Sequence, residues 1–148
     1  MEYSTLDKLG VRVSRLGFGC MRFPLTAEGK IDEPRAAAML DTAYKAGVTY
    51  YDTAYFYHQH TGEAFLGRAM KRYPRDTFYL ATKMPMSIVE SLDHAKEIFE
   101  GQLAALQTDY VDFYLLHAVN GERWKQAQEM GIVDFLLEMQ KAGRIRHF

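Results

Sequence analysis

The hydrophobic and polar positions follow two different periods along the chain. Short runs of β-branched and aromatic residues, such as "VTYYD" at residues 48–52, are typical of strands. Longer segments, such as residues 87–108, carry apolar residues every three or four positions, which is the spacing of an amphipathic helix. The two patterns alternate along the chain. This alternation predicts βαβ units and a parallel sheet.

The predicted elements begin with two short β runs on either side of Gly10. Asp32 and Thr61 are expected to cap the first turns of two helices, and Gly47 is expected to end the first of them. A third β run is predicted at 14–19, helices at 31–47, 61–74, 87–108 and 131–143, and strands at 48–52, 76–83, 110–117 and 144–148.

Two further segments are expected to lie outside the core. Residues 118–130 are interpreted as a long loop in which Trp124 covers the rim of the sheet. The basic clusters at 71–75 and 141–147 fall at helix ends, where solvated cations suit the helix dipole.

Polar side chains stand at the ends of successive predicted strands. Asp52 ends the first helix-flanked strand and Tyr57 follows it, Lys83 ends the next strand, and His117 ends the one after. Because the carboxyl ends of parallel strands face one side, and adjacent strands lie ~4.8 Å apart, these side chains can meet.

This set of residues could make the Tyr57 phenol an effective proton donor. A phenol is a poor proton donor at neutral pH, but a nearby ammonium stabilises the phenolate and so helps the phenol to release its proton. Asp52 would hold Lys83 charged and in place, and His117 could donate a hydrogen bond to a substrate oxygen. Together these groups could polarise and protonate a carbonyl while another group supplies hydride.

At these positions the sequence resembles the aldo-keto reductase family. "GVTYYDTAYFY" is similar to the family's signature, "LATKMP" and "DYVDFYLLH" to its lysine-bearing and histidine-bearing strands, and "LGFGCMR" to its first barrel strand. The resemblance implies a catalytic tetrad of Asp52, Tyr57, Lys83 and His117, with Tyr57 as general acid and His117 also binding the substrate. It further implies NADPH as hydride donor, contacted by Met21 and Asp52, and an aldehyde or ketone as substrate.

The resemblance covers essentially the whole chain but about half of the family's pattern. It implies an α/β fold, a parallel (β/α) barrel of the TIM type, present as its first four βα units and the start of strand five after an N-terminal β-hairpin. Residues 1–148 would then be the N-terminal half of one barrel domain, since a complete barrel needs ~250 residues. The segment "GFGCMRFP" looks similar to bacterial members with an iron-sulfur module, but no C-x-x-C motif supports such a cluster in this chain.

A half barrel would leave its apolar inner face and two sheet edges open. We therefore expect self-association through these edges, with two copies closing a pseudo-barrel, unless the chain is a piece of a longer protein. The sequence ends within the predicted strand at 144–148, which favours the piece of a longer protein, because domain boundaries usually lie in linkers.

Composition narrows the classes of partner. The net charge of -1 gives no basic field to attract nucleic acid or anionic lipid. No window approaches the ~20 apolar residues that span a bilayer, so neither a nucleic-acid nor a membrane partner is expected. The single cysteine, Cys20, excludes an internal disulfide, and the first residues lack a secretory signal. We expect a cytoplasmic protein.

Other motifs invite different functions. "GFGC" begins a dinucleotide-binding G-x-G-x-x-G pattern, but Arg22 stands in place of the third glycine. His58 and His60 form an H-x-H pair that could bind a metal with His117, yet no further carboxylate or thiolate is patterned nearby, so no metal site is expected. Cys20 has no acid-base partner in the pattern, which argues against a nucleophilic role.

Three function classes remain open on the sequence. The first is an NADPH-dependent carbonyl reductase, working as an oligomer or as part of a longer protein. The second is a binding or regulatory protein that keeps the fold without turnover, and the third is a non-catalytic half-barrel. The complete set of four polar residues favours the reductase over the binding protein. The absence of most of the family's cofactor-binding positions favours the non-catalytic half-barrel for the isolated chain.

Overall fold

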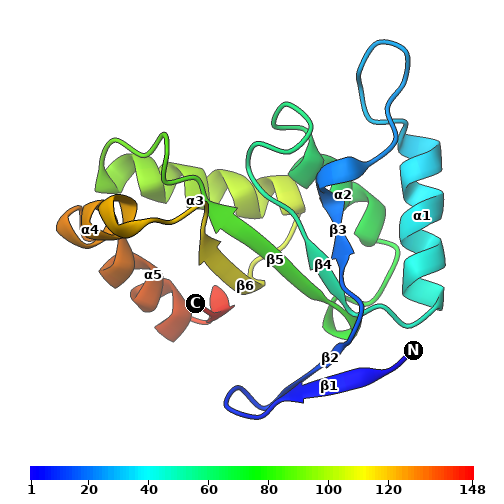
Figure 1. The fold of residues 1–148 in the computed structure, drawn as a ribbon, viewed down its shortest axis with the longest axis horizontal. Coiled ribbons are helices and arrows are strands. Elements are labelled where there is room, and N and C mark those ends of the chain that lie inside the picture. Colours follow the sequence, from blue (N-terminus) through cyan, green and yellow to red (C-terminus); the bar gives the residue numbers. More distant parts are fainter.

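Five parallel strands form the central sheet, and their order in the sheet is their order in the chain (Figure 1). The structure, a computed structural model, describes residues 1–148. At least one helix lies between each pair of neighbouring strands, so the alternation predicted from the sequence is confirmed. The strands are β3 (Phe18–Gly19), β4 (Tyr50–Asp52), β5 (Tyr79–Met84), β6 (Val111–Leu116) and β7 (Ile145–His147).

The helices pack their apolar faces against the strands to form one core. Leu66, Phe99 and Leu136, from three different helices, are almost completely buried in it with Tyr51 and Tyr114 of the sheet. Burial of such a side chain stabilises the fold by about 1.5–3 kcal/mol. None of the helices has both the length and the apolar composition needed to cross a bilayer. The helices are α1 (Glu33–Lys45), α2 (Gly62–Met70), α3 (Leu92–Leu106), α4 (Gly121–Glu129) and α5 (Ile132–Lys141), with 3-10 turns η1 (Cys20–Arg22) and η2 (Arg75–Thr77).

An antiparallel hairpin precedes the sheet. Strand β1 (Tyr3–Leu6) pairs with β2 (Val11–Ser14) along its whole length, and Gly10 between them has a φ of +63°. Glycine adopts this left-handed conformation without steric cost. The two predicted runs around Gly10 are thus confirmed, while the predicted run at 14–19 is reduced to the two residues of β3.

The helix ends follow the sequence signals in part. Asp32 accepts a hydrogen bond from the backbone N–H of Arg35 at 3.2 Å, and Gly47 follows α1 with a φ of +87°, as predicted. Thr61 is the N-cap residue of α2, as predicted, but its side chain makes no capping hydrogen bond. Its hydroxyl donates instead to the carbonyl oxygen of His58 at 2.6 Å.

Two segments between β5 and α5 also differ from the prediction. Helix α3 begins at Leu92 rather than at residue 87, because the Ser91 hydroxyl accepts a backbone N–H and caps the helix there. The expected loop contains α4, which Asn120 caps in the same way. Trp124 lies on α4 and is 43% exposed. Helix α4 could not be predicted from its sequence, "GERWKQAQE", because this segment is too polar to show the apolar periodicity of a helix.

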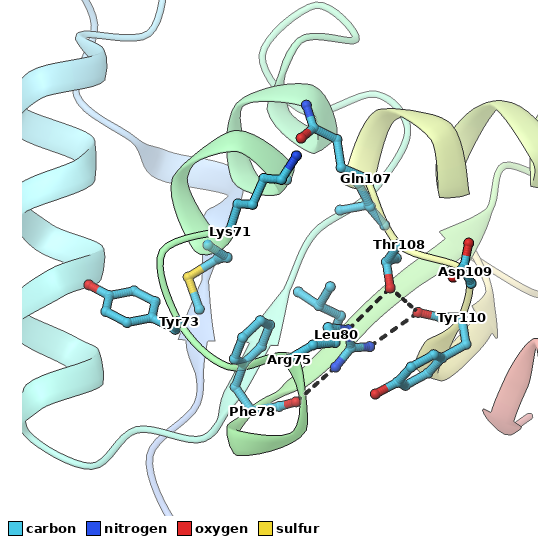
Figure 2. Close-up of a pocket in the computed structure, with 12 residues that line it drawn as sticks. Lys71, Tyr73, Arg75, Phe78, Leu80, Gln107, Thr108, Asp109 and Tyr110 are labelled. Atoms are coloured by element: carbon cyan, nitrogen blue, oxygen red, sulfur yellow. Dashed lines mark hydrogen bonds between the residues drawn. The ribbon is translucent and has the colours of Figure 1, made fainter.

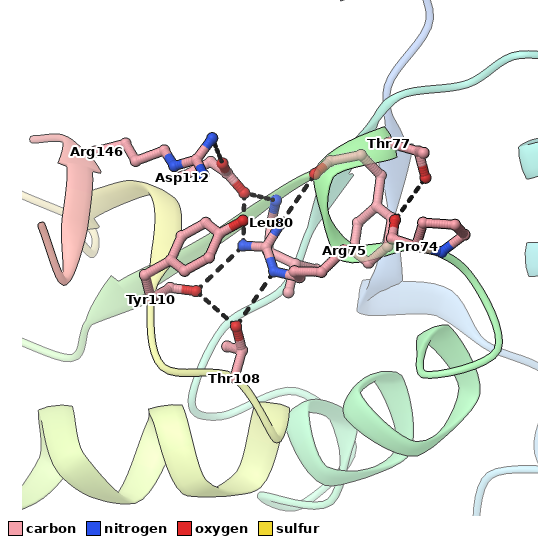
Figure 3. Close-up of polar contacts among 9 residues, drawn as sticks. Pro74, Arg75, Thr77, Leu80, Thr108, Tyr110, Asp112 and Arg146 are labelled. Atoms are coloured by element: carbon pink, nitrogen blue, oxygen red, sulfur yellow. Dashed lines mark hydrogen bonds and ion pairs between the residues drawn. The ribbon is translucent and has the colours of Figure 1, made fainter.

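Arg75 ties the turn after α2 to the sheet (Figure 3). Its guanidinium donates to Asp112 Oδ2 at 2.7 Å and to three oxygens of Thr108, Phe78 and Tyr110 at 3.0–3.2 Å. The Asp112 side chain is 1% exposed and also accepts the backbone N–H of Leu80 at 2.9 Å. The ion pair is therefore part of the packed interior.

Arg75 and the two arginines of the second basic cluster form ion pairs, whereas the lysines of both clusters are exposed, as predicted. Arg146 lies 3.4 Å from Asp112 on the side away from Arg75, and Arg144 forms a two-pronged ion pair with Glu100 of α3. A cavity of about 290 Å³ lies beside Arg75, between the C-terminal ends of α2 and α3 (Figure 2). It lies at the amino ends of β5 and β6, the opposite end of these strands from Lys83 and His117.

Gly67 marks a close approach of α2 to the end of α3. A Cβ added there would lie 2.5 Å from the carbonyl oxygen of Ala105 and 2.7 Å from that of Leu106. Because backbone atoms cannot move aside easily, Gly67→Ala is expected to lower the free energy of unfolding by about 2 kcal/mol, measured by urea denaturation. Gly101→Ala is the matched control: nothing lies within 4 Å of its added Cβ, and it should raise stability by about 0.5–1 kcal/mol. Equal stabilities for the two variants would contradict this packing.

Candidate active site

The register of the sheet brings the polar residues to one rim. Asp52 lies beside Ala81 in the neighbouring strand, and Lys83 follows Ala81 by two residues, so it points to the same face of the sheet. Lys83 in turn lies beside Leu115 of β6, and His117 follows Leu115 by two residues. Successive strands therefore deliver Asp52, Lys83 and His117 to one end of the sheet.

An ion pair anchors the group. Lys83 Nζ lies 2.7 Å from Asp52 Oδ1 and donates a second hydrogen bond, also 2.7 Å long, to the carbonyl oxygen of Thr53. The Lys83 side chain is 13% exposed and that of Asp52 is 32% exposed, so water screens this pair less than a surface pair. The same ammonium lies 5.2 Å from the centre of the Tyr57 ring.

Tyr57 and His117 complete the cluster. Their ring centres are 6.2 Å apart and the rings are nearly perpendicular, at 86°. The Tyr57 hydroxyl makes no hydrogen bond within the protein, and it contacts the other members through its ring. The structure thus brings all four predicted residues together and leaves the phenol O–H free to donate.

His117 is held in place by its backbone. Its N–H donates to the carbonyl oxygen of Met84 at 2.8 Å, which extends the β5–β6 ladder by one residue. Burial lowers the pKa of His117, the Lys83 ammonium lowers it further, and Asp52 opposes both. These shifts favour the neutral imidazole, which has one N–H to donate. Its Nδ1 atom is buried without a hydrogen-bond partner.

The loop that carries Tyr57 turns through a strained segment. His58, Gln59 and His60 have φ angles of 53°, 54° and 67°, a left-handed conformation that costs about 1–2 kcal/mol per residue. His58 Nε2 lies 3.0 Å from the carbonyl oxygen of Cys20, so its ring fastens this loop to η1. No group of three or more His, Cys, Asp or Glu side chains lies close enough to hold a metal ion.

The turn η1 carries the remaining predicted residues of this end of the sheet. Met21 is 44% exposed, and Gly19, two residues before it, pairs with Asp52. Cys20 is completely buried, and this burial raises the pKa of its thiol well above the usual range. A thiolate at Cys20 is therefore disfavoured, in line with the expectation that it is not a nucleophile.

A buried polar network supports the strand that carries Lys83. Gln102 of α3 donates to the carbonyl oxygen of Lys83 at 3.1 Å and to Glu63 Oε1 at 2.8 Å. Glu63 also accepts the Thr82 hydroxyl at 2.5 Å, and the Tyr114 hydroxyl donates to Gln102 Oε1. Burial raises the pKa of Glu63 above its usual value, although the hydrogen bonds donated by Thr82 and Gln102 oppose this rise in part.

The network predicts a specific pH dependence of stability. A carboxyl whose pKa is raised in the folded state contributes stability below its unfolded pKa of about 4.5, and this contribution is lost as pH rises through the folded pKa. The stability of the wild type relative to Glu63→Gln should therefore fall between pH 4.5 and pH 7, measured by urea denaturation at each pH. The exposed Glu90→Gln variant is the matched control. A difference between wild type and Glu63→Gln that does not change with pH would refute this role of Glu63.

Comparison with known proteins assigns this chain to a family. Residues 15–148 match the Aldo/keto reductase family. The chain belongs to the aldo/keto reductase family. The expected resemblance is confirmed, and so is the α/β fold as part of the family's TIM barrel with an N-terminal hairpin.

Individual aldo/keto reductases match most of this chain. "Probable aldo-keto reductase 1" of Glycine max is 31% identical over 123 residues, which are 78% of this chain and 36% of that protein. Aldo-keto reductase YhdN of Bacillus subtilis (strain 168) is 34% identical over 125 residues, covering 79% and 38%. The holo form of the aldo-keto reductase AKR11C1 from Bacillus halodurans matches 99% of this chain and 49% of its own, with 32% identity and a TM-score of 0.79. The chain thus spans about half or less of the length of these aldo/keto reductases.

Three supporting residues were not identified from the sequence. The carbonyl of Thr53 binds Lys83, and a backbone oxygen has no signature in a sequence. His58 was considered as a metal ligand rather than as the fastening of the Tyr57 loop to η1. Gln102 did leave a signal, because it is a polar residue on the buried stripe of an amphipathic helix.

Proposed function

We propose that this chain carries the proton-donating half of an NADPH-dependent reductase that converts an aldehyde or ketone to an alcohol. The observation that carries this proposal is the cluster itself. The Lys83 ammonium, held by Asp52, lies over the Tyr57 ring, and His117 stands edge-on to the same ring. Membership of a family whose relatives bear the name reductase supports the same chemistry.

Each residue has a distinct part in this proposal. Tyr57 donates its phenolic proton to the carbonyl oxygen as the alcohol forms, and the Lys83 ammonium stabilises the resulting phenolate. Neutral His117 donates a hydrogen bond to the same substrate oxygen and so orients the carbonyl. Asp52 and the Thr53 carbonyl fix the position of the ammonium.

The residues present fit one part of a cofactor site. Buried polar atoms without partners, His117 Nδ1 and Thr53 Oγ1, lie in the segments that form the rim, and Met21 is exposed at the end of β3. In this proposal Met21 and Asp52 contact NADPH. Once bound, that cofactor would supply the hydride.

One observation favours a second candidate, a half-barrel without turnover that acts in binding or regulation or as part of a longer reductase. The chain covers 36–49% of the matched relatives described above. The proton-donating residues would then be present without enough of the nucleotide site to use them.

A fluorescence titration with NADPH separates the two candidates. The folded chain is titrated alone, after circular dichroism has verified a cooperative melt, and then assayed with a panel of aldehydes and ketones. Saturable micromolar binding with turnover would support the reductase. A folded sample that neither binds NADPH nor turns over would support the half-barrel that needs further chain.

A further inference from the structure

The cavity beside Arg75 is lined by residues of two consecutive βα units (Figure 2). They belong to α2, to η2 and β5, and to the end of α3 with the segment that leads into β6. The cavity is therefore formed without any strand beyond β7. It lies at the amino ends of β5 and β6, so a molecule bound there would not compete with a carbonyl compound beside Lys83 and His117.

Apolar side chains form the buried part of the cavity wall. Met70, Phe78, Leu80 and Leu106 are each between 2% and 4% exposed. The cavity encloses about 290 Å³, whereas ligand pockets in proteins are typically ~300–1,000 Å³. This space suits one ring or a short hydrocarbon chain, and it is too small for a dinucleotide.

Hydrogen-bond donors without partners lie at the same cavity. Lys71 is exposed, and its ammonium forms neither an ion pair nor a hydrogen bond within the protein. The side-chain amide of Gln107 makes no hydrogen bond either, and Figure 2 shows it at the same end of the cavity as the Lys71 ammonium. Arg75 uses four of its five N–H groups on oxygen atoms of the protein, which leaves one on Nη1.

The charges around the cavity favour an anion. Lys71 and Arg75 line it together with one carboxylate, Asp109, which Figure 2 shows turned away from Lys71. Asp112 does not line the cavity, and it is shared by Arg75 and Arg146. The negative ends of α2 and α3 oppose an anion. That effect is screened at the surface, whereas the Lys71 ammonium can donate directly to an anion.

The apolar wall and the free donors together define the class of ligand. A metal cation would be repelled by Lys71 and Arg75, and an inorganic anion would leave the apolar wall uncovered. A neutral hydrocarbon would bury polar groups without partners. A carboxylate on an apolar body satisfies both parts of the wall. We propose that this cavity binds a small monocarboxylate with an aromatic or short aliphatic body, whose carboxylate lies at Lys71 and whose body lies against Met70 and Phe78.

Benzoate is the probe for this site, and the methyl group of Met70 is the reporter. The chain has eight methionines, so the NMR spectrum of the labelled methionine methyl groups is simple, and a Met70→Leu variant assigns the signal. Met21, in η1 beside the candidate active site, is the internal reference. Benzoate should shift the Met70 signal saturably, with a Kd in the millimolar range that is usual for so small a ligand, and leave the Met21 signal unchanged.

Two further ligands separate the charge from the ring. Benzamide has the ring without the charge, and acetate has the charge without the ring. Each should bind at least about ten-fold more weakly than benzoate, because benzamide loses the charge-assisted hydrogen bond and acetate loses the apolar contact.

Lys71→Met tests the donor. It removes the ammonium but keeps a long side chain, and it should raise the Kd for benzoate about ten-fold, as expected for the loss of a hydrogen bond to a charged group. Lys141→Met is the matched control, because Lys141 is also an exposed lysine at a helix end but does not line the cavity. It should bind benzoate like the wild type. Both positions are exposed, so both variants should fold.

Several results would overturn the proposal. A Met70 signal that stays unchanged throughout the benzoate titration would show that the cavity is not a carboxylate site. Equal affinity for benzamide or acetate, or an unchanged Kd in Lys71→Met, would contradict the ligand class. A shift of Met21 without a shift of Met70 would assign benzoate to the candidate active site instead. None of these measurements depends on NADPH or on turnover, so this inference and the proposed reductase can fail separately.

Discussion

Tyr57→Phe is expected to lower the rate of carbonyl reduction about 10²–10⁴-fold, the contribution typical of a positioned general acid. Phenylalanine keeps the ring that contacts Lys83 Nζ and the His117 imidazole, and it removes the O–H group alone. Because that hydroxyl makes no hydrogen bond within the protein, the free energy of unfolding should not change. The rate is followed by NADPH consumption.

Tyr55→Phe is the matched control for this prediction. Tyr55 lies in the same loop, but its ring contacts Phe56 and His60 rather than the ion pair. Its replacement should leave both the turnover rate and the NADPH affinity near the wild-type values. Unchanged turnover in the Tyr57→Phe variant would remove Tyr57 as the acid, whatever the control showed.

Arg75→Ala is expected to lower the free energy of unfolding by about 3 kcal/mol, because it leaves a buried carboxylate without its closest cation. Asp112 is 1% exposed and keeps its hydrogen bond from Leu80, but the remaining cation, Arg146, lies 3.4 Å away. The carbonyl oxygens of Phe78 and Tyr110 also lose a donor. We place the effect at the low end for a buried pair because the Arg75 side chain is 25% exposed.

Urea denaturation of Arg75→Ala and Arg15→Ala measures this effect against an exposed pair. Arg15 lies 2.8 Å from Glu2, but these side chains are 63% and 79% exposed. The loss for Arg15→Ala should be about 0.5 kcal/mol or less. If Arg75→Ala cost no more than Arg15→Ala, the Asp112 cluster would not be a stabilising part of the interior.

The sequence predicted the fold wherever its apolar pattern was strong. The run "VTYYD" and the stripe in residues 92–106 lie where they were expected, since both are decided by burial against the sheet. Helix α4 was missed because it buries a single residue and is held by a cap and its neighbours instead. The solvated reading of Arg75 was wrong because Asp112, its partner, lies 37 residues away, and such pairings depend on the tertiary fold.

The membership of the candidate site was also predictable, but its contacts were not. Their positions at the ends of successive strands, one βα unit apart, are enough to bring Asp52, Lys83 and His117 to one rim. That spacing does not say that the ammonium lies over the face of the Tyr57 ring, or that the His117 ring stands edge-on to it. Those details depend on the left-handed turn after Tyr57. The turn could not be predicted, because its residues are not glycines.

The order of the strands has a consequence for how the chain is made. From β4 onward, each strand pairs with the strand that was synthesised before it, and only β3 depends on a later strand for its first partner. His117 is synthesised before β7, so the four residues of the candidate site and the strands that carry them have been synthesised while about a fifth of this sequence remains untranslated. The two edges of this sheet are therefore its oldest strand, β3, and its youngest, β7.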